Sequence, residues 1–80
     1  MTAAKNMKVK PGDTVVLTAV PPGMLEDLPS EDQQAITEIV GKPILLTQFE
    51  EDGRAELEFQ DRNGHFHSLY VAPEFITKPV

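Results

Sequence analysis

Two histidines separated by one residue, His65 and His67, are the part of the chain best suited to chemistry. Alternate side chains of a β-strand lie on one face, so the two imidazoles would point the same way, with Asp61 opposite His65 across a turn. Two histidines and a carboxylate can hold zinc. The same strand face also carries the apolar Phe59 and Leu69, and the chain has no third histidine. We therefore expect a partly buried His67 and a solvated His65, with a weak metal site at Asp61, His65 and His67 as the alternative.

Hydroxyl groups and paired carboxylates do not form a catalytic pattern. Ser68 adjoins His67, but neighbouring residues of a strand point to opposite faces, and no G-x-S-x-G elbow is present. Ser30 is in a position to begin a helix. Glu56 and Glu58 share one strand face, but an exposed pair lacks the burial that separates the pKa values of an acid and a base. We expect a protein that is not an enzyme and that binds no cofactor.

Acidic residues dominate two segments of the chain, and the net charge is −6. Residues 26–38 carry five acids and no base, and residues 50–61 carry six acids and one base, Arg54. Such a surface repels phosphate backbones and favours cationic partners. Four lysines could form a small basic patch, which leaves weak nucleic-acid binding as a further hypothesis: Lys5, Lys8, Lys10 and Lys42.

A chain of 80 residues is expected to form one small domain with a thin core. We expect residues 1–8 to form a flexible arm and residues 9–80 to form the domain. Cysteine is absent, which excludes disulfides and thiolate ligands and fits a reducing cytoplasm. The longest apolar runs are too short to cross a bilayer. These features predict a soluble cytoplasmic protein that is monomeric, while pairing of two copies through an open strand edge stays an open question.

The first half of the domain is expected to hold one strand and one helix. Residues 14–20 form a β-branched run, typical of a strand, which ends at Pro21. Residues 31–40 carry apolar side chains at helical spacing. Ser30 and Gln33 match the S-x-x-Q capping box, and a glycine follows the helix as a left-handed stop. The loop at residues 24–28 is expected to pack on the strands.

Three strands are expected next, at residues 44–49, 54–60 and 65–71. Two turns join them, each with a glycine in the left-handed position, Gly53 and Gly64. The middle strand alternates cleanly, with Ala55, Leu57 and Phe59 on one face and Glu56, Glu58 and Gln60 on the other. A 3₁₀ turn at residues 72–74 and a short strand at residues 75–76 complete the domain.

The pairing of the last two long strands decides which side chains are exposed. A two-residue turn at Asn63-Gly64 would place Phe59 opposite Ser68, whereas a bulged turn over residues 62–64 places Phe59 opposite His67. A slip of one residue exchanges the two faces of a strand. The bulged register joins apolar residues on the core side, so we predict that register.

The expected order of elements is that of the SH3 fold. The chain resembles small, largely uncharacterised bacterial SH3-like barrel proteins in three segments, VKPGDTV at 9–15, IVGK at 39–42 and LYVAPEFI at 69–76. The resemblance implies a mainly β, SH3-like barrel of about five strands with one short α-helix inserted in the loop after the first strand. It implies no activity, because such barrels host unrelated functions. Peptide-binding SH3 domains carry a groove rich in Tyr and Trp, and this chain has one Tyr and no Trp.

The bulged register creates one surface of interest on the outer side of the three strands. Phe66 and Tyr70 then project beside Glu56 and Glu58, and Leu46 is expected to join them. Aromatic side chains rimmed by acids suit a basic or amphipathic protein segment. We predict a non-catalytic protein-interaction module that uses these five residues. The alternatives are that the helix or the 24–28 loop covers them as ordinary core, and that the domain is an accessory subunit of an enzyme complex.

Overall fold

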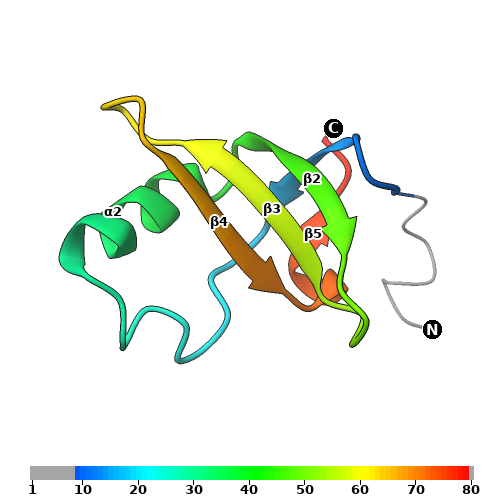
Figure 1. Cartoon of the computed structure of the whole chain (residues 1–80), viewed down its shortest axis with the longest axis horizontal. Coiled ribbons are helices and arrows are strands. Elements are labelled where there is room, and N and C mark those ends of the chain that lie inside the picture. Colours follow the sequence, from blue (N-terminus) through cyan, green and yellow to red (C-terminus); the bar gives the residue numbers. More distant parts are fainter. Residues whose placement is uncertain (1–8, 80) are drawn as a thin grey trace.

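The computed structural model describes residues 9–79, in which five β-strands and one α-helix are present (Figure 1). The strands are β1 (Thr14–Leu17), β2 (Pro43–Phe49), β3 (Ala55–Gln60), β4 (Phe66–Val71) and β5 (Ile76–Thr77). Helix α2 (Ser30–Ile39) lies between β1 and β2, and a 3₁₀ helix, η1 (Pro73–Phe75), lies between β4 and β5. The protein is mainly β with one helix after the first strand, as predicted. The predicted arm at residues 1–8 lies outside the described residues.

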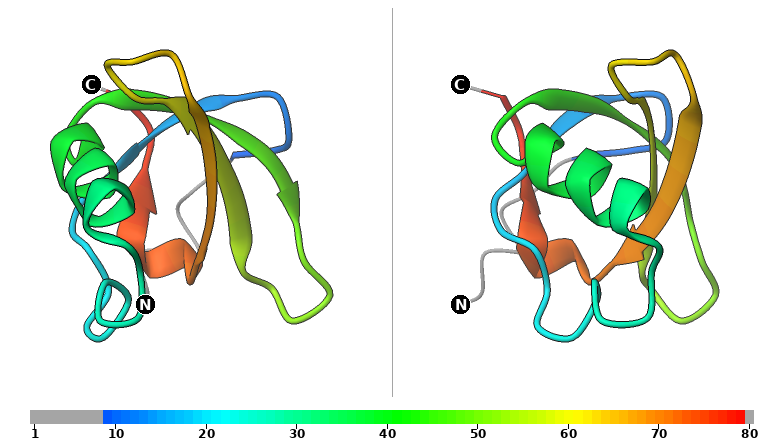
Figure 2. Two further views of the ribbon diagram at one scale, coloured as in Figure 1. Left: turned by 60° about the vertical axis from the view of Figure 1, so that its left-hand side comes forward. Right: turned by 90° about the vertical axis from the view of Figure 1, so that its left-hand side faces the viewer.

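All five strands belong to one antiparallel sheet in the order β4-β3-β2-β1-β5. Strands β4 and β5 are therefore its two edges, and no hydrogen-bonded pairing closes the sheet within residues 9–79. Figure 2 shows that the sheet curls and that α2 lies across the opening that the curl leaves. The helix turns three buried side chains, Ala35, Ile36 and Ile39, toward the sheet.

The core fills the space between the curled sheet and α2. Its largest fully buried side chains are Val15, Leu17, Leu46, Leu57 and Val71. The loop that precedes α2 adds three partly buried side chains, Met24, Leu25 and Leu28, as predicted from the sequence. This loop therefore covers the inner side of the sheet and leaves the outer side open.

Strands β3 and β4 adopt the predicted bulged register. Phe59 pairs with His67, Leu57 with Leu69 and Ala55 with Val71. The turn has the expected geometry, since Gly64 has a φ of 85° and its N–H donates to the Asp61 carbonyl at 3.0 Å. A positive φ of this kind is readily adopted by glycine alone. The register places the side chains of Phe66 and Tyr70 on the outer face of the sheet.

Leu46 is not on the outer face, and this prediction was wrong. Leu46 pairs with Leu57, points into the core and is fully buried. Its neighbour Leu45 lies on the outer face instead and is 40% exposed. The run at residues 44–46 is apolar throughout, so its alternation has two possible phases, and a shift of one residue exchanges the faces. A β-bulge at Thr47 shifts the register by one residue, so that beyond it Gln48 pairs with Glu56 and Phe49 with Ala55.

Helix α2 begins without the predicted capping box. Ser30 is the first helical residue, Pro29 is the N-cap, and no side chain caps the helix. The Gln33 amide instead donates to the carbonyls of Leu25 and Leu28, at 2.7 and 3.0 Å. The Gln33 side chain therefore binds two carbonyls of the preceding loop, whereas the capping motif predicts that it binds the backbone at the start of the helix. This helix, ten residues long and the longest in the described part of the chain, is too short to span a membrane.

Candidate functional site

The outer face of strands β2, β3 and β4 carries three large exposed apolar side chains close to two acidic residues of β3. Phe66 is 69% exposed, Leu45 40% and Tyr70 39%. Glu56 and Glu58 lie between them on β3 and are half-buried. We name these five residues the outer patch. Cross-strand pairing sets its order, because Glu58 lies between Leu45 and Ser68, and Glu56 lies between Gln48 and Tyr70.

Tyr70 is held in place by its neighbours on the patch. Its hydroxyl donates to Glu56 Oε2 at 3.1 Å, and the Arg54 guanidinium lies 5.4 Å from the centre of its ring. The Thr47 hydroxyl donates to Glu56 Oε1 at 2.8 Å. The hydrogen bond to the Glu56 carboxylate, together with its negative charge, raises the pKa of Tyr70. The β-bulge at Thr47 thus helps to orient one acid of the patch, which no local pattern in the sequence indicates.

Glu58 and Phe66 are the members of the patch that are free to meet a partner. Within residues 9–79, the Glu58 carboxylate has no hydrogen-bond or ion-pair partner. Phe66 pairs with the exposed Gln60 of β3, and its ring lies largely in solvent. A free carboxylate and an uncovered ring on neighbouring strands can contact a cation and an apolar group of one ligand at the same time.

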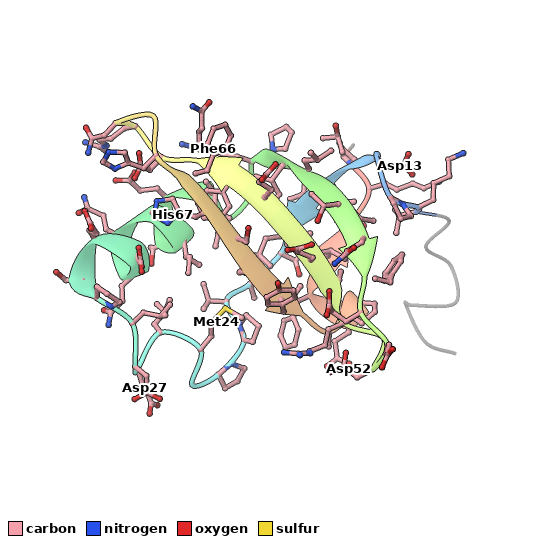
Figure 3. All side chains as sticks on the ribbon, viewed as in Figure 1. Asp13, Met24, Asp27, Asp52, Phe66 and His67 are labelled. Carbon is pink, nitrogen blue, oxygen red and sulfur yellow. The ribbon has the colours of Figure 1, made fainter. Side chains whose placement is uncertain are left out.

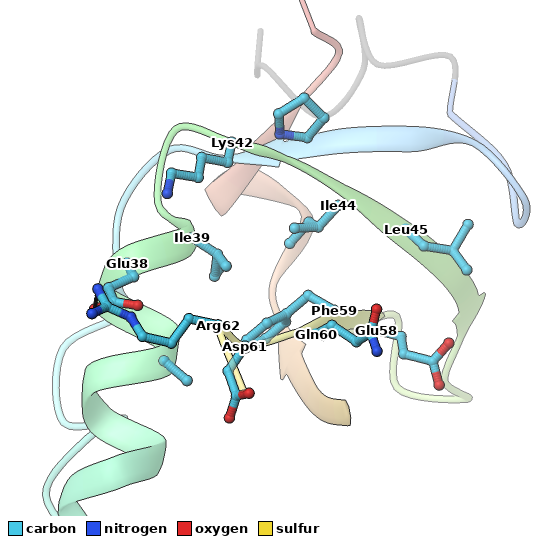
Figure 4. A pocket seen from close by; sticks show the side chains of 12 residues that line it. Glu38, Ile39, Lys42, Ile44, Leu45, Glu58, Phe59, Gln60, Asp61 and Arg62 are labelled. Atoms are coloured by element: carbon cyan, nitrogen blue, oxygen red, sulfur yellow. Dashed lines mark hydrogen bonds and ion pairs between the residues drawn. The ribbon is translucent and has the colours of Figure 1, made fainter. Parts of the chain in front are cut away.

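An open pocket of about 490 Å³ adjoins the outer patch (Figure 4). It lies where the start of β2, the end of β3 and the end of α2 meet, and it shares Leu45 and Glu58 with the patch. Its apolar residues include Ile39, Ile44 and Phe59. Sequence reasoning missed this pocket, because it is assembled from segments that are far apart in the chain.

One wall of the pocket is an ion pair between the β3–β4 turn and α2. Arg62 Nη2 lies 2.6 Å from Glu38 Oε2. Lys42 also lines the pocket, together with three acids, Glu38, Glu58 and Asp61. The pocket therefore carries charges of both signs around apolar side chains, an arrangement that suits an amphipathic chain better than a simple anion.

The structure brings the three residues of the predicted metal site together, but as a hydrogen-bonded cluster. Asp61 Oδ2 lies 2.8 Å from His67 Nε2 and 3.7 Å from His65 Nδ1. Asp61 Oδ1 accepts the backbone N–H groups of Asn63 and His65, at 2.8 and 2.9 Å. These bonds, that from His67 first, lower the pKa of Asp61 to about 2. Among residues 9–79, no group of three His, Asp or Glu side chains is arranged to hold a metal ion.

His67 serves as a link between the sheet and the helix. Its side chain is 14% exposed, as expected for a partly buried histidine, and its ring stacks on Phe59 with centroids 5.3 Å apart. Its Nδ1 lies 3.4 Å from Asp32 in the first turn of α2. In Figure 3, His67 lies on the side of β4 toward α2, and Phe66 lies away from it. His65 is largely exposed, as predicted, with 70% of its side chain in solvent.

The predicted basic patch can be described only in part. Lys5 and Lys8 lie outside the described residues. Lys10 is exposed before β1, and Lys42 is exposed immediately before β2, where it lines the pocket. Comparisons of the chain with protein-family models, with curated proteins and with solved structures found no match.

Proposed function

We propose that this chain is a small SH3-like barrel of the cytoplasm that acts as a non-catalytic protein-interaction module. The outer patch would bind a basic, amphipathic segment of another protein. The observation that carries the proposal is the 69% exposure of Phe66 next to a free glutamate, Glu58. An aromatic ring left in solvent on a small domain supports a docking role, since buried aromatic side chains are common anchors of interfaces.

The charges of the surrounding residues support a cationic partner. The negative charges of Glu56 and Glu50 both raise the pKa of Tyr70, and Glu58 pairs with the next outer residue of β4, Ser68. Arg54 is the base that lies against this face, and it is already paired with Asp52 at 2.8 Å. Complementary charge speeds association and excludes wrong partners more than it adds affinity. We expect lysine or arginine side chains of the partner to lie next to the carboxylates of Glu58 and Glu56 and to pair with them.

The pocket supports a partner that is apolar on one side. Leu45 and Glu58 belong to both the outer patch and the pocket. A segment that crosses the sheet could therefore contact Phe66 or Tyr70 and place an apolar side chain next to Ile44 and Phe59. Such a segment could belong to an enzyme, in which case the domain would be an accessory subunit, and the identity of the partner would decide this.

The test is selection of binding peptides from a random library on wild-type protein, followed by affinity measurement. The proposal expects selected peptides rich in Lys or Arg next to apolar residues, with binding that weakens as salt rises. The variant F66A/Y70A should lose binding at least about tenfold, since anchor residues typically contribute about 2 kcal/mol or more. Glu58→Lys should also weaken it.

The matched control is Phe49→Ala, which removes an aromatic ring of similar exposure, 40%, from the end of β2 outside the patch. It should bind as wild type does. Selection of acidic peptides, or equal binding by F66A/Y70A, would contradict the proposal. Circular dichroism must show that F66A/Y70A is folded, and unfolding of this variant would mean that the two rings are structural.

A further inference from the structure

Strand β4 is an edge of the sheet (Figure 1), and the hydrogen bonds of the hairpin show which of its backbone groups are free. At the turn, the Asp61 N–H donates to the His65 carbonyl at 2.9 Å. In an antiparallel pair, every second residue bonds to the partner strand and the others point away from it. Counting from this bond, the residues of β4 that bond to β3 are His67, Leu69 and Val71. Phe66, Ser68 and Tyr70 therefore direct their backbone groups toward the open edge.

No hydrogen bond within the described part of the chain uses this edge. Among residues 9–79, no loop or helix backbone group hydrogen-bonds to the backbone of Phe66, Ser68 or Tyr70. All three residues are exposed. The backbone groups of these three residues therefore have no hydrogen-bond partner in the described part of the chain.

The β4 strand itself also lacks several of the features by which proteins prevent strand pairing. Such features are a charged side chain, a proline, a bulge or a very short strand. β4 has six residues, FHSLYV, with no Lys, Arg, Asp, Glu or Pro, and its pairing with β3 is regular throughout. The opposite edge differs, since β5 has two residues and Pro79 follows closely. Of the two edges, β4 is the one left open to another strand.

We propose that two copies of this chain pair through β4, antiparallel, about a two-fold axis at Ser68. In this register Ser68 faces Ser68 of the second copy, and Phe66 faces Tyr70 in both directions. Each of these facing pairs joins residues with free backbone groups, so each exchanges two hydrogen bonds. Registers centred on His67 or Leu69 keep fewer such pairs within the strand. The centre at Ser68 is therefore the most complete pairing that the strand allows.

Side chains favour the same register. Aromatic pairs across strands stabilise a sheet, and Phe66 would lie beside Tyr70 of the second copy on the outer face. In the row of residues that pair across the axis, Ser68 of each copy lies next to Glu58 of the same copy. The two Glu58 residues are therefore separated by the two Ser68 residues, which is a distance of three strand spacings. At a strand spacing of about 4.8 Å, these charges lie beyond the screening length of about 8 Å at physiological salt. Within this row, repulsion between the acids of the two copies is therefore largely screened.

The expected dimer is weak and reversible. A single six-residue strand pairing gives an interface at or below about 1,000 Å², the size of transient complexes. We expect a Kd between about 1 μM and 1 mM. Pairing would join two sheets into one and place both outer patches on a continuous face. The inference stands apart from the proposed partner, because it rests on the backbone of β4.

Sedimentation velocity of the full chain, up to about 1 mM, tests the pairing. Wild type should shift from monomer to dimer as concentration rises. Ser68→Lys places two ammonium groups face to face at the axis and should raise the Kd at least about tenfold. The matched control is Thr14→Lys, which adds the same charge to an exposed residue of β1 in the same cross-strand row. Both variants leave Phe66 and Tyr70 in place.

Cysteine cross-linking tests the register, since the chain has no natural cysteine. Directly facing hydrogen-bonded residues have Cα atoms about 5.5 Å apart, within the range of a disulfide. Ser68→Cys should form a covalent dimer under mild oxidation, and Thr14→Cys should not. A mixture of Phe66→Cys and Tyr70→Cys should form mixed dimers in preference to dimers of either variant alone.

A wild-type chain that stays monomeric at about 1 mM would overturn the proposal. So would a dimer that Ser68→Lys and Thr14→Lys weaken equally, because the contact would then lie elsewhere. Dimerisation with cross-linking at another register would overturn the assignment of the axis. The peptide-binding test is read separately, at protein concentrations below about 1 μM, where the expected dimer is mostly dissociated.

Discussion

The two faces of the β3–β4 hairpin differ in what their side chains do, although they belong to the same twelve residues. On the inner face, Leu57, Leu69 and Val71 are almost fully buried, and the polar His67 is tied to Asp61. On the outer face every residue of β4 is exposed, and Phe66 is 69% exposed. The inner face therefore stabilises the fold, whereas the outer-face side chains of β4 remain exposed to solvent.

The same contrast appears within β2, between two adjacent leucines. Leu46 is fully buried, and Leu45 is 40% exposed. The two side chains are chemically identical, so the difference in exposure comes only from the face of the sheet on which each one lies. A change of each to alanine is consequently a direct test of the assignment of faces.

The largest expected effect is on Leu46. Leu46→Ala should lower the free energy of unfolding by about 2–5 kcal/mol, because it leaves a cavity in the core. Leu45→Ala should lower it by less than about 1 kcal/mol, as a surface substitution does. Urea denaturation followed by circular dichroism measures both. Similar losses for the two variants would show that the faces of β2 are not divided in this way.

A smaller effect is expected from the polar end of the inner face. The pKa of Asp61 is lowered from 3.8 to about 2 in the folded protein, so the unfolded chain binds the proton more readily. The resulting stability is present above pH 3.8 and is lost as the pH falls toward about 2. Asp61→Asn should flatten this part of the curve of unfolding free energy against pH.

His67→Phe provides the second arm of this experiment. It keeps a ring against Phe59 and removes the donor that contributes most to the low pKa of Asp61. The acid dependence should become shallower than in wild type, but less so than in Asp61→Asn, because the two backbone donors remain. Curves of the same slope in all three proteins would mean that the cluster does not act on Asp61.

The smallest effect is expected on the outer face. Glu56→Gln removes the carboxylate whose hydrogen bond and negative charge raise the pKa of Tyr70, so tyrosinate should form at a lower pH than in wild type. Stability should change by about 0.5 kcal/mol or less, since surface interactions of this kind contribute little. Absorbance titration of the single tyrosine measures the shift. No shift would show that Tyr70 is not held by Glu56.

Much of the hairpin could be predicted from local pattern. The alternation of residues 55–60 identified the inner and outer faces of β3, and the pairing of apolar with apolar residues selected the bulged register over the two-residue turn. Both depend on residues within one hairpin. The outer positions of Phe66, Tyr70, Glu56 and Glu58 followed from them and are confirmed.

Other features depended on contacts between distant segments, and local pattern did not indicate them. The apolar run at 44–46 could face either way until β1 and β3 were in place on its two sides. Gln33 matched a capping motif, but two carbonyls of the preceding loop lie within its reach. The pocket beside the outer patch needs Glu38 and Arg62 to meet, which only the packing of α2 brings about.

Local pattern is enough to specify the mainly β class, the position of the helix, the turns and the two faces of β3, because hydrophobic period and glycine placement act over short stretches of chain. The packing of the folded chain sets the phase of β2, the pocket, the contact between His67 and α2, and the identity of the open edge. Those features are set by which strand pairs with which and by what packs against the sheet. A neighbour in space, unlike a neighbour in sequence, leaves no periodic signal in the chain.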